Sequence, residues 1–260
     1  PPLLGGVVSV GFGTSSPEMG VSSMAALDGN PGLALGNALG SNIVNVGLVL
    51  GATAMLAPIA VRSGIVRREL PLLLAIGLFA GWLFLDGALT RVESFALLAG
   101  FVGVVGWSIH TALRGHSDAL ADEMDAELAV PRMPLGRAIF WLVIGLVLLI
   151  ASSRLLVWGA VGVAESLGVS DLVIGLTIVA IGTSLPELAA SILAVSKQEH
   201  DIALGNVVGS NMFNLLAIIG IASLVGPIPV DSQFLTFDLW IMLAASLLLI
   251  PFVYFRGVFG

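Results

Sequence analysis

Eight apolar stretches of this chain are each long enough to cross a lipid bilayer, which takes about 20 helical residues. In hydrocarbon every backbone polar group needs a partner within the spanning structure, so single apolar stretches of this length fold as helices. Hydrophobic residues make up 57% of the 260 residues and charged residues only 10%. The sequence therefore predicts an all-α polytopic membrane protein. The predicted spans are 3–25, 33–57, 70–89, 93–113, 136–163, 171–195, 202–226 and 237–256.

A hexapeptide, Gly-Thr-Ser-x-Pro-Glu, occurs twice, at residues 13–18 and at residues 182–187. The same offset of 169 (182 − 13) superposes the Gly-Ser-Asn sequence at 40–42 on that at 209–211. The register continues without a gap to Gly260. Chance does not produce a match of this length, so the chain contains two copies of one unit.

Basic residues fall mostly on one side when the loops are assigned alternately to the two sides of a membrane. That side collects eight of them, whereas the other has only Arg91, so the positive-inside rule makes the richer side cytoplasmic. The loops 58–69, 114–135 and 196–201 are then cytoplasmic, and the two hexapeptide helices run in opposite directions. We expect inverted-topology repeats in an integral, multi-pass protein of the plasma (inner) membrane. Such repeats place substrate sites at the midplane, between broken helices.

The offset also divides the chain into three parts. Residues 1–113 form the first inverted repeat, 114–135 a cytoplasmic connector, and 136–260 the second inverted repeat. The first span of the second repeat has no counterpart before Pro1, and the last span of the first repeat has none after Gly260. We therefore expect ten spans, five plus five, of which eight are visible in this sequence.

Glu18 and Glu187 are the two carboxylates placed near the middle of predicted spans, one in each repeat. A carboxylate at bilayer depth is costly and usually marks an ion pathway. Each follows a proline, which frees backbone carbonyls one turn earlier. Hydroxyl, carbonyl and carboxylate oxygens suit hard cations such as Na⁺ and Ca²⁺. The alternative is structural: the glutamates are protonated, or pair with Arg154 within its span.

Hydroxyl and amide residues accompany each glutamate. Two hydroxyl residues precede it by three or four positions and share its helical face. Each Gly-Ser-Asn helix adds a serine and an asparagine at i and i+4. Packing and interhelical hydrogen bonding are the ordinary uses of such residues in membrane helices, but their symmetric placement favours ligands. These candidates are Thr14, Ser15, Ser41, Asn45, Thr183, Ser184, Ser210 and Asn214.

Other polar and small residues of the same helices receive structural interpretations. The remaining asparagines lie off the ligand face and are expected to bond to exposed backbone; they are Asn37, Asn42, Asn206 and Asn211. Glycines in these helices are expected to let neighbouring helices approach closely. They are Gly36, Gly40, Gly205 and Gly209.

At the hexapeptides and the Gly-Ser-Asn-x-x-Asn elements the sequence resembles the sodium/calcium exchangers of the cation/calcium antiporter superfamily. The resemblance covers both repeats. It implies ten helices in two inverted halves, with a central cluster of four ion sites that serves three Na⁺ or one Ca²⁺ by alternating access. It implies that the hydroxyl, amide and carboxylate candidates are the ligands, joined by the backbone carbonyls of Gly11 and Ala180. Family members with Asp at the position of Asn214 include potassium-dependent exchangers, so Asn214 argues for potassium independence.

The expected function is therefore electrogenic exchange of three Na⁺ for one Ca²⁺, with these ions and the lipid bilayer as partners. Alternatives are H⁺/Ca²⁺, K⁺-dependent or Mg²⁺ exchange on the same fold, or a passive cation channel or non-transporting membrane subunit. No phosphate-binding loop, nucleophile arrangement or basic nucleic-acid patch occurs, and there are no cysteines. We expect no enzyme activity, no cofactor, no nucleic-acid binding and no obligate protein partner.

Overall fold

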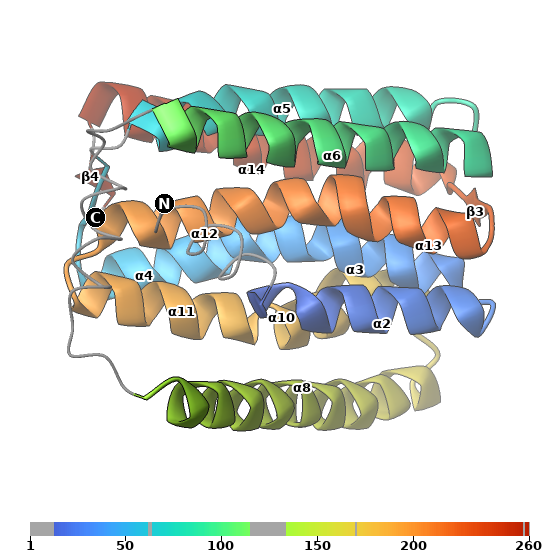
Figure 1. The fold of residues 1–260 in the computed structure, drawn as a ribbon. Coiled ribbons are helices and arrows are strands. Elements are labelled where there is room, and N and C mark those ends of the chain that lie inside the picture. Colours follow the sequence, from blue (N-terminus) through green and yellow to red (C-terminus); the bar gives the residue numbers. More distant parts are fainter. Residues whose placement is uncertain (1–12, 62–63, 115–133, 170, 257, 260) are drawn as a thin grey trace.

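The computed structural model describes residues 13–61, 64–114, 134–169, 171–256 and 258–259, and these are almost entirely helical (Figure 1). The first repeat begins with α2 (Ser16–Leu27), α3 (Pro31–Val44), the π-helical turn η1 (Asn45–Val49) and α4 (Leu50–Leu56). The turn η1 joins α3 to α4 without a break, and the three form one apolar rod over Pro31–Leu56.

The second repeat has the corresponding elements at the same offset. A first segment consists of α9 (Asp171–Ile174), η2 (Gly175–Val179) and α10 (Ala180–Thr183), and it is followed by α11 (Leu185–Ser196). A second rod consists of α12 (His200–Phe213), η3 (Asn214–Ile218) and α13 (Ile219–Val225). In Figure 1, α2 leads to the right-hand end of the bundle and α11 to the left-hand end, so the two hexapeptide helices run in opposite directions.

The hexapeptide is where each first helix breaks. Ser15 and Ser184 have nearly identical backbone angles, φ −85° and ψ 7° against φ −84° and ψ 2°, which depart from the α-helical region. Pro17 and Pro186 then occupy the first turn of α2 and α11, where a missing N–H costs no hydrogen bond. In the second repeat the axis bends by 45° at this point. The predicted broken helix is thus observed in the second repeat, where the break at Ser184 lies three residues before Glu187.

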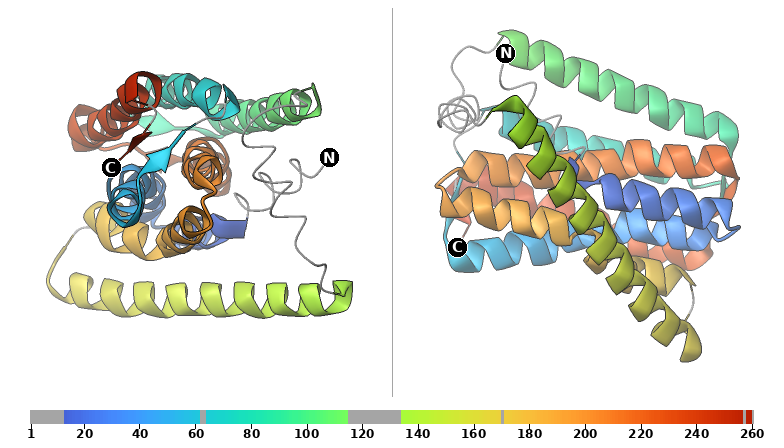
Figure 2. Two further views of the ribbon diagram at one scale, coloured as in Figure 1. Left: turned by 90° about the vertical axis from the view of Figure 1, so that its left-hand side faces the viewer. Right: turned by 60° about the horizontal axis from the view of Figure 1, so that its bottom comes forward.

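The two hexapeptide segments and the two rods form the centre of the bundle, and the remaining described helices flank it on two sides. The helices α5 (Gly64–Leu83), α6 (Arg91–Arg114) and α14 (Leu239–Pro251) form a layer on one side, and π-helical turns η4 (Phe234–Asp238) and η5 (Phe252–Arg256) extend α14. The long helix α8 (Leu135–Ser166) crosses the opposite side obliquely (Figure 2). The centre is therefore enclosed by apolar helices.

Two small strand pairs lie at the ends of the otherwise helical bundle. The strand β1 (Ile59–Ala60) pairs with β4 (Val258–Phe259), and β2 (Ala88–Leu89) pairs with β3 (Ile228–Pro229), both antiparallel. Prolines before β1 and within β3 hold the chain extended after each rod, which leaves backbone groups to be satisfied by a neighbouring strand. Each pair joins a strand of the first repeat to one of the second, so backbone hydrogen bonds connect the repeats at both ends of the bundle.

Among the described residues, four helices meet the length and hydropathy expected of a membrane span, and the bent pair at 175–196 makes five. They coincide with predicted spans 33–57, 93–113, 171–195, 202–226 and 237–256. The predicted span 136–163 corresponds to α8, and the first half of 3–25 lies outside the described residues. The predicted span 70–89 was placed about six residues too late, because α5 ends at Leu83 and residues 88–89 form β2. The counts of eight and ten spans, and the inverted topology across the membrane, stay predictions.

Polar side chains are concentrated in the interior of the bundle. The second rod is the most enclosed candidate span, with 83% of its apolar window buried, yet it carries Asn206, Ser210, Asn211 and Asn214. Large apolar side chains such as Met55 and Trp158 instead face outward, 88% and 77% exposed. This distribution fits a protein surrounded by lipid and enclosing a polar centre.

Candidate ion-binding site

The two glutamates lie in the first turn of α2 and α11, immediately after the breaks, and both are fully buried. A carboxylate in the first turn interacts favourably with the positive end of its helix. The hydroxyl and amide candidates of both repeats are buried as well, except that Thr14 is partly exposed. Gly11 lies outside the described residues. The structure therefore brings the described candidates into the same enclosed centre.

Oxygens from both repeats meet at Glu187. Ser15 Oγ lies 3.0 Å from Glu187 Oε1 and 3.0 Å from Ser210 Oγ, and Ser210 Oγ lies 3.3 Å from the same carboxylate oxygen. The two hydroxyls donate to the carboxylate, and Ser15 comes from the first repeat while the others come from the second. The site is therefore formed between the repeats, and neither half contains it alone.

A second contact between repeats involves Thr183. Its Oγ1 donates to Asn37 Oδ1 at 3.0 Å and lies 3.3 Å from Ser41 Oγ. Its counterpart, Thr14, donates to Asn206 Oδ1 at 3.3 Å. Each candidate threonine is thus held by an asparagine of the other repeat.

Among the residues that the structure describes, the site contains buried polar atoms without a hydrogen-bond partner, most of them oxygens. Within the described part of the chain, several oxygens have no hydrogen-bond partner although they are inaccessible to solvent. They are Glu18 Oε1 and Oε2, Glu187 Oε2, Asn45 Oδ1, Asn214 Oδ1 and Ser184 Oγ. A buried carboxylate or carbonyl oxygen without a partner is costly, and a hard cation is the species that would satisfy several of them at once.

The candidate carbonyl of Ala180 is already engaged. It accepts the backbone N–H of Ser184 at 3.1 Å and the hydroxyl of Thr183 at 3.4 Å. Its role as an ion ligand stays a prediction. The alternative partner of the glutamates, Arg154, has a side chain outside those that the structure describes, so the structural interpretation through that residue is not tested.

The sequence-based interpretation of the other asparagines was incomplete. The amides of Asn37, Asn42 and Asn211 do donate to backbone carbonyls, as expected. They also contact candidate ligands, however, and so does Asn206. The available signal was the offset itself, because Asn37 and Asn42 each recur 169 positions later.

The glycine prediction is confirmed at Gly40, where an added Cβ would lie 2.5 Å from the backbone oxygen of Leu176. Gly36 also lies against η2, because a Cβ added to Gly175 would meet its Cα at 3.1 Å. Around Gly209 no described atom lies within 4 Å of such a Cβ, so close approach there finds no support among these residues.

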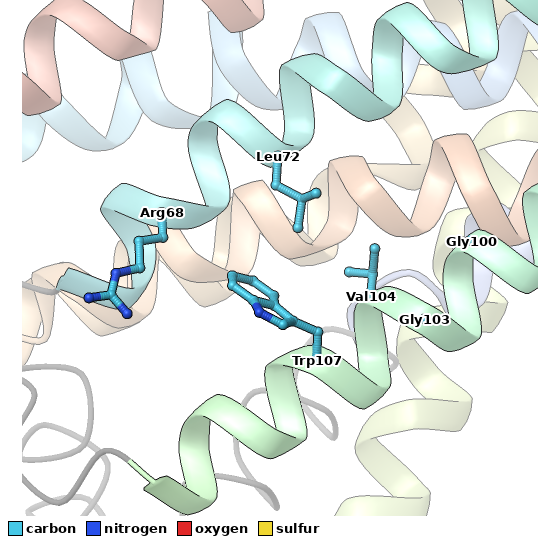
Figure 3. A pocket seen from close by; sticks show the side chains of 6 residues that line it. All are labelled: Arg68, Leu72, Gly100, Gly103, Val104 and Trp107. Atoms are coloured by element: carbon cyan, nitrogen blue, oxygen red, sulfur yellow. The ribbon is translucent and has the colours of Figure 1, made fainter.

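A cavity of about 500 Å³ lies elsewhere, between α5 and α6 (Figure 3). Glycines of α6 and the side chains of Leu72, Val104 and Trp107 line it, with Arg68 at one end. None of the candidate ligands contributes to it. It is an apolar cavity distinct from the ion-binding centre.

Comparisons with known proteins agree with this arrangement. The profile of the family described as sodium/calcium exchanger protein matches residues 1–110 and 137–259. The putative antiporter CaxA of Alkalimonas amylolytica is 50% identical over 254 residues, covering 96% of this chain and 78% of that protein. The sodium/calcium exchanger MaX1 of Methanosarcina acetivorans is 30% identical over 285 residues, covering 95% of this chain and 80% of that protein.

A solved structure provides a comparison at the level of the fold. The sodium-calcium exchanger NCX_Mj, soaked with 2.5 mM Na⁺ and 0.1 mM Ca²⁺, is similar over 100% of this chain and 81% of its own, with a TM-score of 0.76 and 31% identity. Sequence profile, relatives and fold thus coincide over both repeats. The chain belongs to the sodium/calcium exchanger family.

Proposed function

We propose that this protein exchanges Na⁺ for Ca²⁺ across a membrane, and that the buried centre formed by the two hexapeptides and the two Gly-Ser-Asn helices binds both ions. The observation that carries the proposal is the set of buried oxygens from both repeats that lack a partner among the described residues. Membership of the sodium/calcium exchanger family supports the identity of the ions. The proposed ligands are the oxygen-bearing residues named from the sequence, including Gly11 and Ala180.

The charge of the site supports exchange. Two carboxylates offset the charge of one Ca²⁺, whereas the same pair left empty and ionised at bilayer depth is strongly unfavourable. This penalty discourages the empty site from changing its access, and obligatory exchange requires that restriction. We propose a stoichiometry of three Na⁺ for one Ca²⁺, which moves one net charge and is worth about 2.3 kcal/mol per 100 mV.

Alternating access follows from the proposed symmetry of the repeats. The opposite directions of α2 and α11 in Figure 1, together with the asymmetric distribution of basic residues, support inverted repeats at 1–113 and 136–260 around a cytoplasmic connector. In that arrangement each repeat closes one side of the site, and the two exchange conformations during transport. The same distribution supports a cytoplasmic position for the loops 58–69 and 196–201.

Proton-coupled Ca²⁺ transport is the second candidate. Both carboxylate oxygens of Glu18 lack a partner among the described residues, and a proton would neutralise this group as a cation does. Asn214 argues against additional coupling, because an amide at that position leaves the site with two carboxylates and no third group to take up a proton or K⁺ charge. We therefore propose that exchange is independent of K⁺.

Transport by the reconstituted protein tests the proposal. Proteoliposomes loaded with Na⁺ and diluted into Na⁺-free medium with radioactive Ca²⁺ should accumulate Ca²⁺, and a K⁺ diffusion potential should change the rate because a net charge moves. Uptake driven by a pH gradient with Na⁺ absent on both sides would establish the proton-coupled alternative. Ca²⁺ flux without any counter-ion would indicate a channel, and either result would overturn the proposal.

A further inference from the structure

Four asparagines, Asn42 and Asn45 of the first rod and Asn211 and Asn214 of the second, form a hydrogen-bonded group at the centre. Each is at most 1% exposed. Asn42 Nδ2 donates to the backbone oxygen of Asn211 at 3.2 Å, and Asn211 Nδ2 donates to the backbone oxygen of Asn42 at 3.4 Å. The two residues are 169 positions apart and are therefore equivalents of each other. Equivalent residues in reciprocal contact lie on the axis that relates the two repeats.

The second pair of bonds crosses the same axis. Asn45 Nδ2 donates to Asn211 Oδ1 at 3.0 Å, and Asn214 Nδ2 donates to Asn42 Oδ1 at 3.0 Å. Both π-helical turns begin at the donating residue, at Asn45 in η1 and at Asn214 in η3. Each candidate ligand amide is thus held by an asparagine of the other repeat.

The backbone carbonyls determine the orientation of every amide in the group. A carbonyl oxygen only accepts, so Asn42 and Asn211 must present their NH₂ groups to it and their Oδ1 atoms to the other side. Each Oδ1 in turn only accepts, so Asn45 and Asn214 must present NH₂ to it. The Oδ1 atoms of Asn45 and Asn214 are then forced to the opposite edge of their amides, where they have no partner among the described residues.

The two π-helical turns that carry Asn45 and Asn214 pack against the glutamate-bearing helices. The turn η1 packs against α11, which carries Glu187, and the turn η3 packs against α2, which carries Glu18. We infer that Asn42 and Asn211 are positioning residues: they orient the side-chain oxygens of Asn214 and Asn45 for cation binding without touching the ion themselves. This inference rests on the proposed ion-binding role of Asn45 and Asn214. Residues that orient ligands in this way typically change cation affinity about 10- to 100-fold.

The inference assigns each positioning residue to one ligand, and a double-mutant cycle tests that assignment. Asn42→Leu should weaken Ca²⁺ binding at least about tenfold in the parent protein. The loss should shrink to less than about twofold in the Asn214→Ala background, because the group that Asn42 orients is already absent. In the Asn45→Ala background the loss should remain at its full size.

Ca²⁺-dependent stabilisation of the purified full chain provides the measurement, because a ligand that binds only the folded state raises the melting temperature according to its affinity. It needs no transport cycle. Ser223→Ala is the matched control, since it removes a buried bond between two helices, Ser94 Oγ to Ser223 Oγ at 2.7 Å, that lies outside the site. It should lower the ion-free melting temperature while leaving the Ca²⁺ affinity unchanged.

Equal effects of Asn42→Leu in the parent and in both ligand backgrounds would overturn the inference, because a purely structural role does not distinguish Asn214 from Asn45. If the Asn42→Leu protein cannot be expressed in folded form, the same cycle is run with Asn42→Ala, which leaves space for water beside Asn214. It is also run with Asn211→Leu, for which the coupled partner is Asn45. Failure of the proposed function can be distinguished from failure of this inference. If the parent protein binds Ca²⁺ but shows no Na⁺-driven uptake, the proposed function fails, while the double-mutant cycle can still be measured.

Discussion

Replacing Glu18 by glutamine should weaken Ca²⁺ binding and stabilise the ion-free protein at the same time. Glu18 is fully buried, and neither of its carboxylate oxygens has a hydrogen-bond partner in the described part of the structure. With Ca²⁺ bound, the carboxylate offsets part of the ion's charge. Without an ion the same group is a buried acceptor with nothing to accept. The amide has nearly the same shape, so the substitution changes the charge more than the packing.

The magnitudes follow from burial. Removing one partner of a buried ion pair costs about 3–5 kcal/mol, which corresponds to a roughly 150- to 5000-fold weaker Ca²⁺ affinity. At a pH high enough to ionise Glu18 in the ion-free protein, its unpaired buried charge costs several kcal/mol, whereas an unsatisfied neutral amide costs about 1–3 kcal/mol. We expect a gain of about 1–2 kcal/mol in unfolding free energy, or roughly 2–8 °C in melting temperature for a protein of this size.

Glu187 should respond differently, although it occupies the equivalent position. Its Oε1 accepts hydrogen bonds from Ser15 and Ser210, and bonds to a charged acceptor are stronger than those to a neutral one. Glu187→Gln should therefore abolish tight Ca²⁺ binding to the same extent but give little or no gain in ion-free stability. Glu93→Gln is the control, because Glu93 caps the start of α6 through Thr90 and lies outside the site.

The assay is thermal unfolding in detergent with and without Ca²⁺, together with Na⁺-driven Ca²⁺ uptake into proteoliposomes at matched protein levels. Normal uptake by Glu18→Gln would refute the proposed ligand role. A lower ion-free melting temperature in that variant would refute the claim that its carboxylate is unsatisfied in the absence of a cation.

Three further substitutions test other parts of the site. Asn214→Asp adds a third carboxylate, so Ca²⁺ exchange should become sensitive to pH or K⁺ in flux assays while the parent is indifferent to K⁺; a parent that requires K⁺ would contradict this. Gly40→Ala places a Cβ 2.5 Å from a backbone oxygen of η2 and should lower the free energy of unfolding by about 1–3 kcal/mol. Gly106→Ala is the control: a Cβ added there has no described atom within 4 Å, so the melting temperature should not fall. Thr183→Val removes a hydroxyl that bonds across the repeats and should weaken cation affinity roughly 5- to 100-fold. Thr177→Val is the control, because Thr177 is exposed and its hydroxyl bonds only within its own helix, so affinity should stay unchanged. Equal effects of the two variants would argue against a ligand role for Thr183.

Much of this arrangement could be predicted from the sequence because the repeat supplies long-range information that local patterns lack. The offset of 169 identified the equivalent helices, and the proline of each hexapeptide, Pro17 or Pro186, predicted where they break. The cost of a carboxylate in hydrocarbon singled out Glu18 and Glu187. These inferences depend only on composition, periodicity and the chemistry of single side chains.

The contacts between the repeats could not be predicted in this way. Helical periodicity places Asn42 off the face of Asn45, and therefore off the predicted ligand face of that helix. It says nothing about the opposite repeat, where Asn42 meets Asn214. The short strands were missed for the same reason, since β1 and β4 are only two residues long and acquire their structure from a partner about two hundred positions away in the chain.

The central asparagine group also has a consequence for biosynthesis. Asn42 and Asn211 are each other's partners, yet 169 residues separate them. At a synthesis rate of about 5–20 residues per second, the first rod waits roughly 10–30 s in the membrane before the second rod arrives. During that time its buried amides must be accommodated by water, lipid headgroups or their own helix. Because lipid provides no hydrophobic drive for helices to associate, the hydrogen bonds that the late rod supplies contribute directly to the assembly of the two halves.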